Sequence, residues 1–155
     1  IGDAPPTFEQ IRRLPFARAV FRETLRLYPP VSFITRVAMK DGLIGKEEAP
    51  KGALVVVSPW IIHRHRRFWD APEVFAPRRF LGANEKRIAP GSYIPFGLGP
   101  RVCTGASFAT TESVLILASI ARRYRIETTN ADRVEPVGKL TTRPKEPVRM
   151  RFVRR

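Results

Sequence analysis

The single cysteine of this chain lies in a glycine-rich loop whose composition suits a reactive thiolate. Residues 96–105, the cysteine loop, read Phe-Gly-Leu-Gly-Pro-Arg-Val-Cys-Thr-Gly, and an apolar helical pattern begins directly after them. Arg101 and the amino end of that helix would both stabilise a negative charge on the sulfur of Cys103. Phe96 can cover one side of the sulfur, and glycine lets the backbone approach a ligand closely. The loop therefore predicts one thiolate held for a metal or a flat cofactor.

The first strong helix signal covers residues 14–27, where apolar side chains recur at three- and four-residue spacing. The sequence Tyr28-Pro29-Pro30 ends this pattern, because a residue that precedes proline is disfavoured in a helix. Glu23 and Arg26 lie three residues apart on the expected helix and therefore share a face. Spacing alone favours a surface ion pair between them, which would contribute less than ~1 kcal/mol to stability.

A small antiparallel sheet is expected next, from residues 31–37 and 53–58. Both stretches are rich in β-branched residues, and turn signals separate them. Residues 58–65 are expected to form one short helix that carries His63 and His65. The two histidines lack the helical spacing of a zinc site. We expect them to be exposed or to cap the helix rather than to bind metal.

The rest of the chain is expected to combine turns with one long helix and a hairpin. Residues 66–80 form a turn-rich stretch, and residues 81–93 form a polar surface meander. Residues 105–124 are apolar on nearly every side, which predicts a buried helix. Residues 140–142 and 148–153 are candidate strands of a terminal hairpin. The apolar anchors of the turn-rich stretch are Trp69, Phe75 and Phe80.

Size and composition limit the classes of protein to which the chain can belong. Its 155 residues fit one domain, and a single cysteine excludes both an intramolecular disulfide and a CxxC pair. No apolar run approaches the ~20 residues of a membrane span. The formal charge of +14 would suit nucleic acid, an anionic membrane or acidic protein partners. The arginines are scattered without interleaved aromatic residues, so a basic nucleic-acid-binding module is kept only as a remote alternative.

Four stretches together resemble the cytochrome P450 family, the haem-thiolate monooxygenases. The cysteine loop matches that family's pattern, Phe-x-x-Gly-x-Arg-x-Cys-x-Gly, at every fixed position. The pair formed by Glu23 and Arg26 falls on an upstream helix, as the family's ExxR pair does. Residues 77–80 look like the family's PERF box, with Arg78 where glutamate is usual. The proline-rich meander lies between the box and the loop in the right order.

The resemblance implies an α+β fold, mainly helical, that corresponds to the C-terminal portion of the P450 fold. Its parts would be the ExxR helix, a small β-sheet, the meander, the cysteine loop, a long helix and a terminal hairpin. Residues 1–155 would be a single C-terminal fragment of a haem-thiolate monooxygenase domain. The family's distal helix and N-terminal half have no counterpart in these residues, so we expect marginal stability and a large exposed apolar patch.

The resemblance also implies roles for individual residues around a haem b. Cys103 would be the axial ligand of the haem iron, and Phe96 would shield its sulfur. Arg101 and Arg36 would bind the haem propionates through charge-assisted hydrogen bonds. Gly105 would complete the cofactor-binding loop.

Two further sets of residues take their roles from the resemblance. Glu23, Arg26 and Arg79 would form a buried charged triad that fastens the meander to the ExxR helix. The resemblance therefore favours a buried ExxR pair between Glu23 and Arg26 over the surface ion pair that spacing alone favours. One wall of the substrate pocket would be apolar and would contain Val31, Phe33 and Ile34.

The implied reaction is the insertion of one atom of O2 into a small apolar organic substrate. Electrons would come from a ferredoxin or a flavoprotein reductase that docks on the cysteine side. We expect a cytoplasmic protein, with membrane association unlikely and no nucleic acid bound. A truncated, catalytically inactive homologue is the main alternative. The candidate docking residues for the electron donor are Arg66, Arg67, Arg122 and Arg123.

Overall fold

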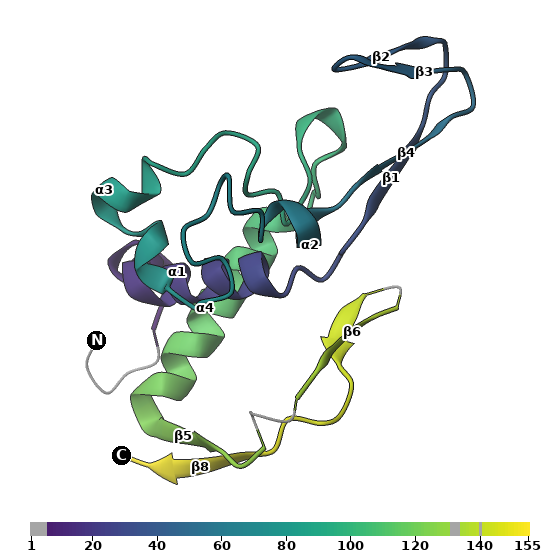
Figure 1. Ribbon diagram of the computed structural model, residues 1–155. Helices are drawn as coiled ribbons and strands as arrows, with labels where there is room; N and C mark the ends of the chain where they lie inside the picture. The colour runs from purple at the N-terminus through teal and green to yellow at the C-terminus, as the bar shows by residue number, and fades with distance from the viewer. Residues whose placement is uncertain (1–5, 131–133, 140) are drawn as a thin grey trace.

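The computed structural model describes residues 6–130, 134–139 and 141–155, and Figure 1 shows how their elements are arranged. Two longer helices, α1 (Pro15–Leu27) and α4 (Ala106–Arg123), pack against each other at the centre of the molecule. The shorter described helices are, in chain order, η1 (Phe8–Arg13), α2 (Pro59–Ile62), η2 (Pro77–Phe80), α3 (Gly82–Glu85) and η3 (Gly99–Arg101).

Helix α1 has nearly the bounds that the sequence predicts, because local chemistry defines both of its ends. Pro15 occupies the first helical position, where its missing N–H costs nothing. At the other end the N–H of Tyr28 donates to the carbonyl of Thr24 at 2.7 Å, and two prolines follow. The buried residues of the helix are Ala19, Glu23, Leu25, Arg26 and Leu27.

The predicted antiparallel sheet is present, although its strands are shorter than residues 31–37 and 53–58. Strand β1 pairs antiparallel with β4, with Ile34 opposite Val57. Strands β2 and β3 form a second hairpin between them, and the two sheets make an arm that extends away from α1 and α4 (Figure 1). These strands are β1 (Ile34–Val37), β2 (Gly42–Ile44), β3 (Glu47–Ala49) and β4 (Leu54–Val57).

The predicted pairing of the C-terminal strands, residues 140–142 with 148–153, is wrong. Strand β8 pairs instead with β5, which directly follows α4, and β6 pairs with β7. Leu140 itself lies outside the described residues. The N–H of Arg155 donates to the carbonyl of Arg123 at 3.0 Å, so the last strand returns to the end of α4. These strands are β5 (Tyr124–Thr128), β6 (Pro136–Gly138), β7 (Thr142–Pro144) and β8 (Met150–Arg154).

An aromatic core lies between α1 and residues 69–93, which include η2. Trp69 and Phe80 are buried against Ala19 of α1, and the rings of Phe80 and Tyr93 lie 4.9 Å apart. Phe75 is 47% exposed, so it is not the anchor that the sequence suggests. Residues 81–93 supply part of this cluster and include helix α3, so they are more than a polar surface meander. Their contributions to the cluster are Leu81, Ile88 and Tyr93.

Helix α4 is less covered than its apolar sequence predicts. Of its residues only Val114 is buried, whereas Phe108 and Ile116 are 71% and 51% exposed. Phe16 of α1 is also exposed. No helix in the described parts of the chain is both long enough and apolar enough to cross a membrane.

Candidate functional site

The cysteine loop is shaped by its glycines and by its own backbone hydrogen bonds. A turn closes where the N–H of Gly97 donates to the carbonyl of Ile94 at 3.0 Å. Gly97 and Gly99 have φ angles of 77° and 71°, a region that residues with a Cβ rarely adopt. The N–H of Cys103 donates to the carbonyl of Phe96 at 2.9 Å. The loop therefore folds back so that Cys103 lies next to Phe96, the half-buried residue with which the loop begins.

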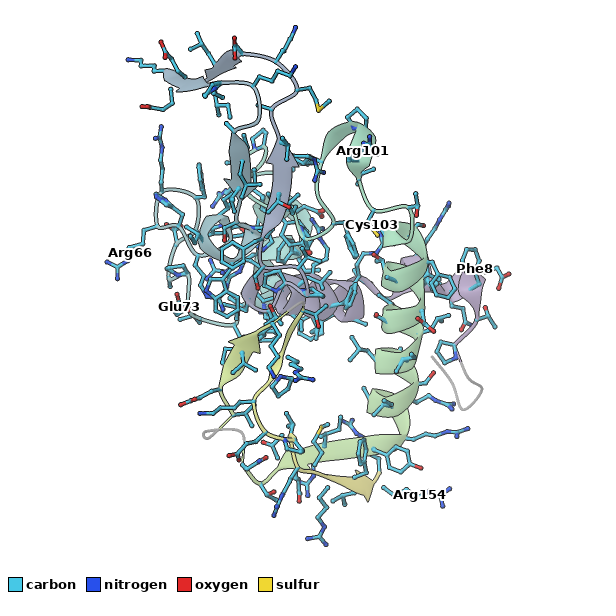
Figure 2. The ribbon with its side chains drawn as sticks, turned by 90° about the vertical axis from the view of Figure 1, so that its right-hand side faces the viewer. Phe8, Arg66, Glu73, Arg101, Cys103 and Arg154 are labelled. Atoms are coloured by element: carbon cyan, nitrogen blue, oxygen red, sulfur yellow. The ribbon has the colours of Figure 1, made fainter. Side chains whose placement is uncertain are left out.

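Cys103 lies at the amino end of α4 and is exposed. Figure 2 shows it beside the first turn of the helix, with Arg101 further out on the loop. A Cβ added at Gly105 would lie 3.8 Å from the cysteine Sγ, an ordinary van der Waals distance. Gly105 therefore lies next to the sulfur of Cys103.

Glu23 and Arg26 form a fully buried ion pair, so the interpretation as a surface pair is wrong. Arg26 Nε and Nη2 donate to the two carboxylate oxygens of Glu23 at 2.7 and 2.8 Å, and both side chains are 0% exposed. Such a bidentate pair is geometrically specific as well as strong. Spacing along a helix could not reveal this burial, because the covering residues come from residues 63–76, far from the helix in the sequence.

The ion pair also binds the backbone of residues 63–76, the segment that precedes and includes the start of the turn into η2. Arg26 Nη1 donates to the carbonyls of His63 at 2.8 Å and of Pro72 at 2.6 Å. In return, the N–H of Ala76 donates to a carboxylate oxygen of Glu23 at 2.8 Å. The buried charges are therefore satisfied by chain segments that lie 37 to 53 positions later, which fixes the path of residues 63–76 over α1.

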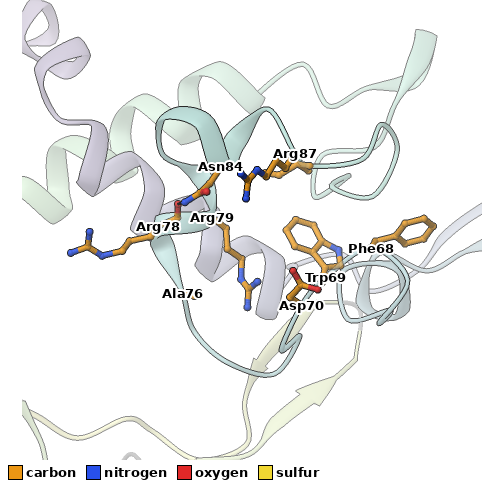
Figure 3. Close-up of a pocket in the computed structure, with 9 residues that line it drawn as sticks. Phe68, Trp69, Asp70, Ala76, Arg78, Arg79, Asn84 and Arg87 are labelled. Atoms are coloured by element: carbon orange, nitrogen blue, oxygen red, sulfur yellow. Dashed lines mark hydrogen bonds between the residues drawn. The ribbon is translucent and has the colours of Figure 1, made fainter.

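Arg79 approaches the same carboxylate from η2. Its Nε lies 3.4 Å from Glu23 Oε1, and its Nη2 donates to the carbonyl of Ala71 at 2.8 Å. Figure 3 shows Arg79 beside Trp69 in a hollow of about 300 Å³. Arg78 is exposed, and its side chain extends away from Arg79 in this view. The unusual second residue of the PERF-like box therefore leaves the Glu23 network undisturbed.

His63 is the C-cap residue of α2, as one of the two expected alternatives had it, but it is buried rather than exposed and has a structural role that the sequence did not identify. It is 0% exposed, and its Nε2 accepts a hydrogen bond from the N–H of Ile94 at 2.8 Å. Burial and the nearby Arg26 guanidinium lower the pKa of His63 to about 4. No local signal could have found this role, because its partners lie 31 and 37 positions away. His65 is exposed, as expected.

The two proposed propionate ligands lie on different elements. Arg36 is exposed on β1, where its Nη1 donates to the carbonyl of Thr35 at 2.7 Å, and Arg101 is exposed in η3. Within the described residues neither forms an ion pair. Both guanidinium groups are therefore available to an anionic ligand.

The proposed substrate wall lies against the cysteine loop and the C-terminal sheet. Val31 and Phe33 are exposed, and a Cβ added at Gly97 would lie 3.8 Å from Cδ1 of Ile34. The hydroxyls of Ser32 and Thr142 are 2.6 Å apart. The N–H of Thr142 also donates to the carbonyl of Pro30 at 2.8 Å. Thr142 is thus a neighbour of this wall that the sequence did not predict.

The four arginines considered for electron-donor docking do not share one face. Arg122 and Arg123 end helix α4 and line a hollow together with Arg154. Figure 2 shows Arg66 on the opposite side of the molecule from Arg154. The Arg66–Arg67 pair therefore cannot join the helix α4 pair in a single docking surface.

Comparison with known proteins shows the family to which this chain belongs. A family model described as Cytochrome P450 matches residues 1–152 of the chain. This chain belongs to the cytochrome P450 family. The buried Glu23–Arg26 pair and the cysteine loop both resemble P450 motifs, and the chain that contains them belongs to that family.

Individual P450 relatives match over most of this chain. Cyclooctatin synthase of Streptomyces melanosporofaciens is 35% identical over 136 residues, which are 88% of this chain and 30% of that protein. Cytochrome P450 4V2 of Homo sapiens is 36% identical over 156 residues, which are 99% of this chain and 30% of that protein. The crystal structure of the cytochrome P450DA heme domain superposes with a TM-score of 0.90 at 31% identity.

The P450 comparisons also define how much of the fold is present. The match to the P450DA heme domain covers 99% of this chain but 34% of that one. The chain thus spans about 30% of the length of the P450 relatives that it matches. It has the fold of one part of a P450 heme domain, a mixture of helices and small antiparallel sheets.

Proposed function

We propose that this chain carries the thiolate side of a haem-dependent monooxygenase site, with Cys103 as the axial ligand of haem b iron. The observation that supports this most directly is the exposed cysteine at the amino end of α4, in a loop held by its hydrogen bond to Phe96. Residues 1–155 would form a single C-terminal portion of the monooxygenase domain. This proposal goes beyond family membership, because the chain spans only about 30% of its relatives.

The side chains around the cysteine fit the chemistry of a haem. A thiolate is a suitable iron ligand, and the propionates of the cofactor require cations. Arg101 and Arg36 are exposed guanidinium groups without a carboxylate partner among the described residues. The contact distance between Ile34 and the Gly97 position brings the strand of Arg36 against the cysteine loop.

Each group of residues would contribute a distinct part of the function. The Cys103 thiolate would donate electron density to the metal, and Phe96 would shield the sulfur from water. The Glu23–Arg26 pair, together with Arg79, would hold residues 63–76 on helix α1 and so fix the point from which the chain continues through η2 and the meander to the cysteine loop. When bound, the haem supplies the activation of dioxygen, from which one oxygen atom would enter a small apolar organic substrate.

The substrate and the electron donor are proposed by chemical class only. Val31, Phe33 and Ile34 would exclude water from one side of the site and favour an apolar substrate. The electrons would come from a ferredoxin or a flavoprotein reductase. The positive charge of the chain would favour association with an acidic donor.

Haem reconstitution of the purified protein tests the proposed function. The reduced, carbon-monoxide-bound form of the wild type should show the red-shifted absorption band of a thiolate-ligated haem. The Cys103→Ser variant should lose this band, because a serine hydroxyl cannot replace the thiolate. Arg78→Ala is the matched control, since Arg78 is exposed and points away from the Glu23 network. A band that persists in Cys103→Ser would reject the ligand assignment.

A catalytically inactive homologue is the second candidate, because Phe108 and Ile116 are exposed and leave helix α4 incompletely covered. This candidate predicts no oxygen-dependent product with reductant and apolar test substrates, whether or not the thiolate band forms. Product formation that requires Cys103 would exclude it.

A further inference from the structure

The imidazole of His63 joins helix α1 to the base of the cysteine loop. Its Nε2 accepts a hydrogen bond from the N–H of Ile94 at 2.8 Å. Because this nitrogen accepts, the neutral ring carries its proton on Nδ1, which lies 3.2 Å from the carbonyl of Arg26 and donates to it. One fully buried ring therefore connects the last turn of α1 to residue 94.

From Ile94 the connection continues through the backbone to the cysteine. The carbonyl of Ile94 accepts the N–H of Gly97 at 3.0 Å, which closes the first turn of the segment. The carbonyl of Phe96 accepts the N–H of Cys103 at 2.9 Å. Hydrogen bonds and short pieces of backbone thus form an unbroken path from His63 to the residue that carries the sulfur.

The surroundings of His63 leave its ring little freedom to move. The ring stacks on that of Tyr93 with centroids 5.4 Å apart and an angle of 26°. The hydroxyl of Tyr93 donates to the carbonyl of Arg22 at 3.1 Å, which is a second link from this segment to α1. The carbonyl of His63 accepts from Arg26 Nη1 at 2.8 Å, so its backbone is held as well.

We propose that His63 is a positioning residue that sets where the cysteine loop, and with it the sulfur of Cys103, lies relative to helix α1. A neutral imidazole suits this task because its two nitrogens point in different directions. One donates to a helix carbonyl, and the other accepts from a loop amide. This inference deepens the proposed function. It rests on that function only for the experiment that uses the haem spectrum as its readout.

Two substitutions can separate the two nitrogens of His63. The amide nitrogen of His63→Asn can take the place of Nδ1 and donate to Arg26, but nothing then accepts from Ile94. The longer side chain of His63→Gln can place an oxygen near Nε2 and restore that acceptor. Trp69→Phe is the control for a general loss of packing, because Trp69 is equally enclosed in the neighbouring core and does not bind the loop backbone.

Amide hydrogen exchange of the purified protein without haem gives the first readout. In His63→Asn the amides of Ile94 and Cys103 should exchange about tenfold faster, as expected when one buried hydrogen bond is lost. His63→Gln should stay close to the wild type, and Trp69→Phe should leave these two amides unchanged relative to the rest of the protein. Equal exchange in the Asn and Gln variants would overturn the proposal. Faster exchange at Ile94 with no change at Cys103 would also overturn it.

The carbon-monoxide spectrum after haem reconstitution gives a second readout. His63→Asn should lose part of the thiolate band to the band of a thiol-ligated haem, and His63→Gln should recover it. An intact thiolate band in His63→Asn would contradict the positioning role. If the wild type itself forms no thiolate band, the proposed function fails, while the exchange result still decides the role of His63.

Discussion

Arg26 and His63 hold each other by hydrogen bonds that run in both directions. The guanidinium of Arg26 donates to the carbonyl of His63 at 2.8 Å, and the imidazole of His63 donates to the carbonyl of Arg26 across 3.2 Å. Both side chains are fully buried. The side chain of Arg26 therefore binds the backbone of His63, and the side chain of His63 binds the backbone of Arg26. The first two predictions test this pair.

Glu23→Gln should destabilise the protein by about 3–5 kcal/mol, because it leaves the buried Arg26 without its counter-charge. The free energy of unfolding in urea measures this loss. The matched control is Glu85→Gln, which removes the solvent-exposed carboxylate partner of Arg22, a residue of the same helix. That change should cost less than ~1 kcal/mol. Similar losses in the two variants would contradict the distinction between the buried and the exposed pair.

Stability should fall as the pH is lowered from about 6.5 to about 4, because of His63. The native state keeps this histidine neutral, with a pKa of about 4, since it is buried beside Arg26 and near Arg64. The unfolded chain protonates at the ordinary histidine pKa of about 6.5, so it binds more protons in this range. At pH 5 the protonation of His63 in the unfolded chain should lower the free energy of unfolding by about 2 kcal/mol relative to pH 7.5.

Urea unfolding at pH 5 and pH 7.5 measures this dependence. His63→Gln should lack the corresponding part of the loss, because glutamine does not titrate. His65→Gln should retain it, because His65 is exposed. The assignment would be wrong if His63→Gln lost as much stability at pH 5 as the wild type.

Gly97→Ala should destabilise the cysteine loop by about 1–2 kcal/mol, the cost of placing a residue with a Cβ at a left-handed φ angle. The space itself is adequate, because the nearest atoms to an added Cβ would be Cδ1 of Ile34 at 3.8 Å and the carbonyl oxygen of Arg101 at 3.9 Å. Gly42→Ala is the control, since it lies in open space without a positive φ angle. Urea unfolding that shows equal costs for both variants would rule out the conformational explanation.

Arg101→Gln should weaken haem binding by about 10- to 100-fold, because a hydrogen bond to a charged group contributes about 1.5–3 kcal/mol. Titration of the purified protein with haem measures the affinity. Arg101→Lys keeps the charge without the forked geometry and should bind with intermediate affinity. Unchanged affinity in Arg101→Gln would remove Arg101 from the cofactor site. The test does not depend on turnover.

The sequence by itself determined the features whose signals are local. Pro15 and the Tyr28-Pro29-Pro30 stretch define the ends of α1 within a few neighbouring positions. The glycines and the cysteine of residues 96–105 define a loop that needs positive φ angles and ends at a helix. These features could be predicted because backbone preferences and capping act between residues that are close in the chain.

Only the tertiary structure decided which polar groups are buried and which segments pair. Spacing alone favours a surface pair for Glu23 and Arg26, and only the family resemblance implies a buried one; in the structure residues 72–76 cover them. His63 is expected from the sequence to be exposed or to cap a helix; it caps α2, but it is buried, and its ring lies between Arg26 and Ile94. Strand β8 pairs with β5 across more than twenty residues rather than with its nearer neighbour. Burial and strand pairing depend on contacts between distant segments, and such contacts leave no periodic pattern in either segment.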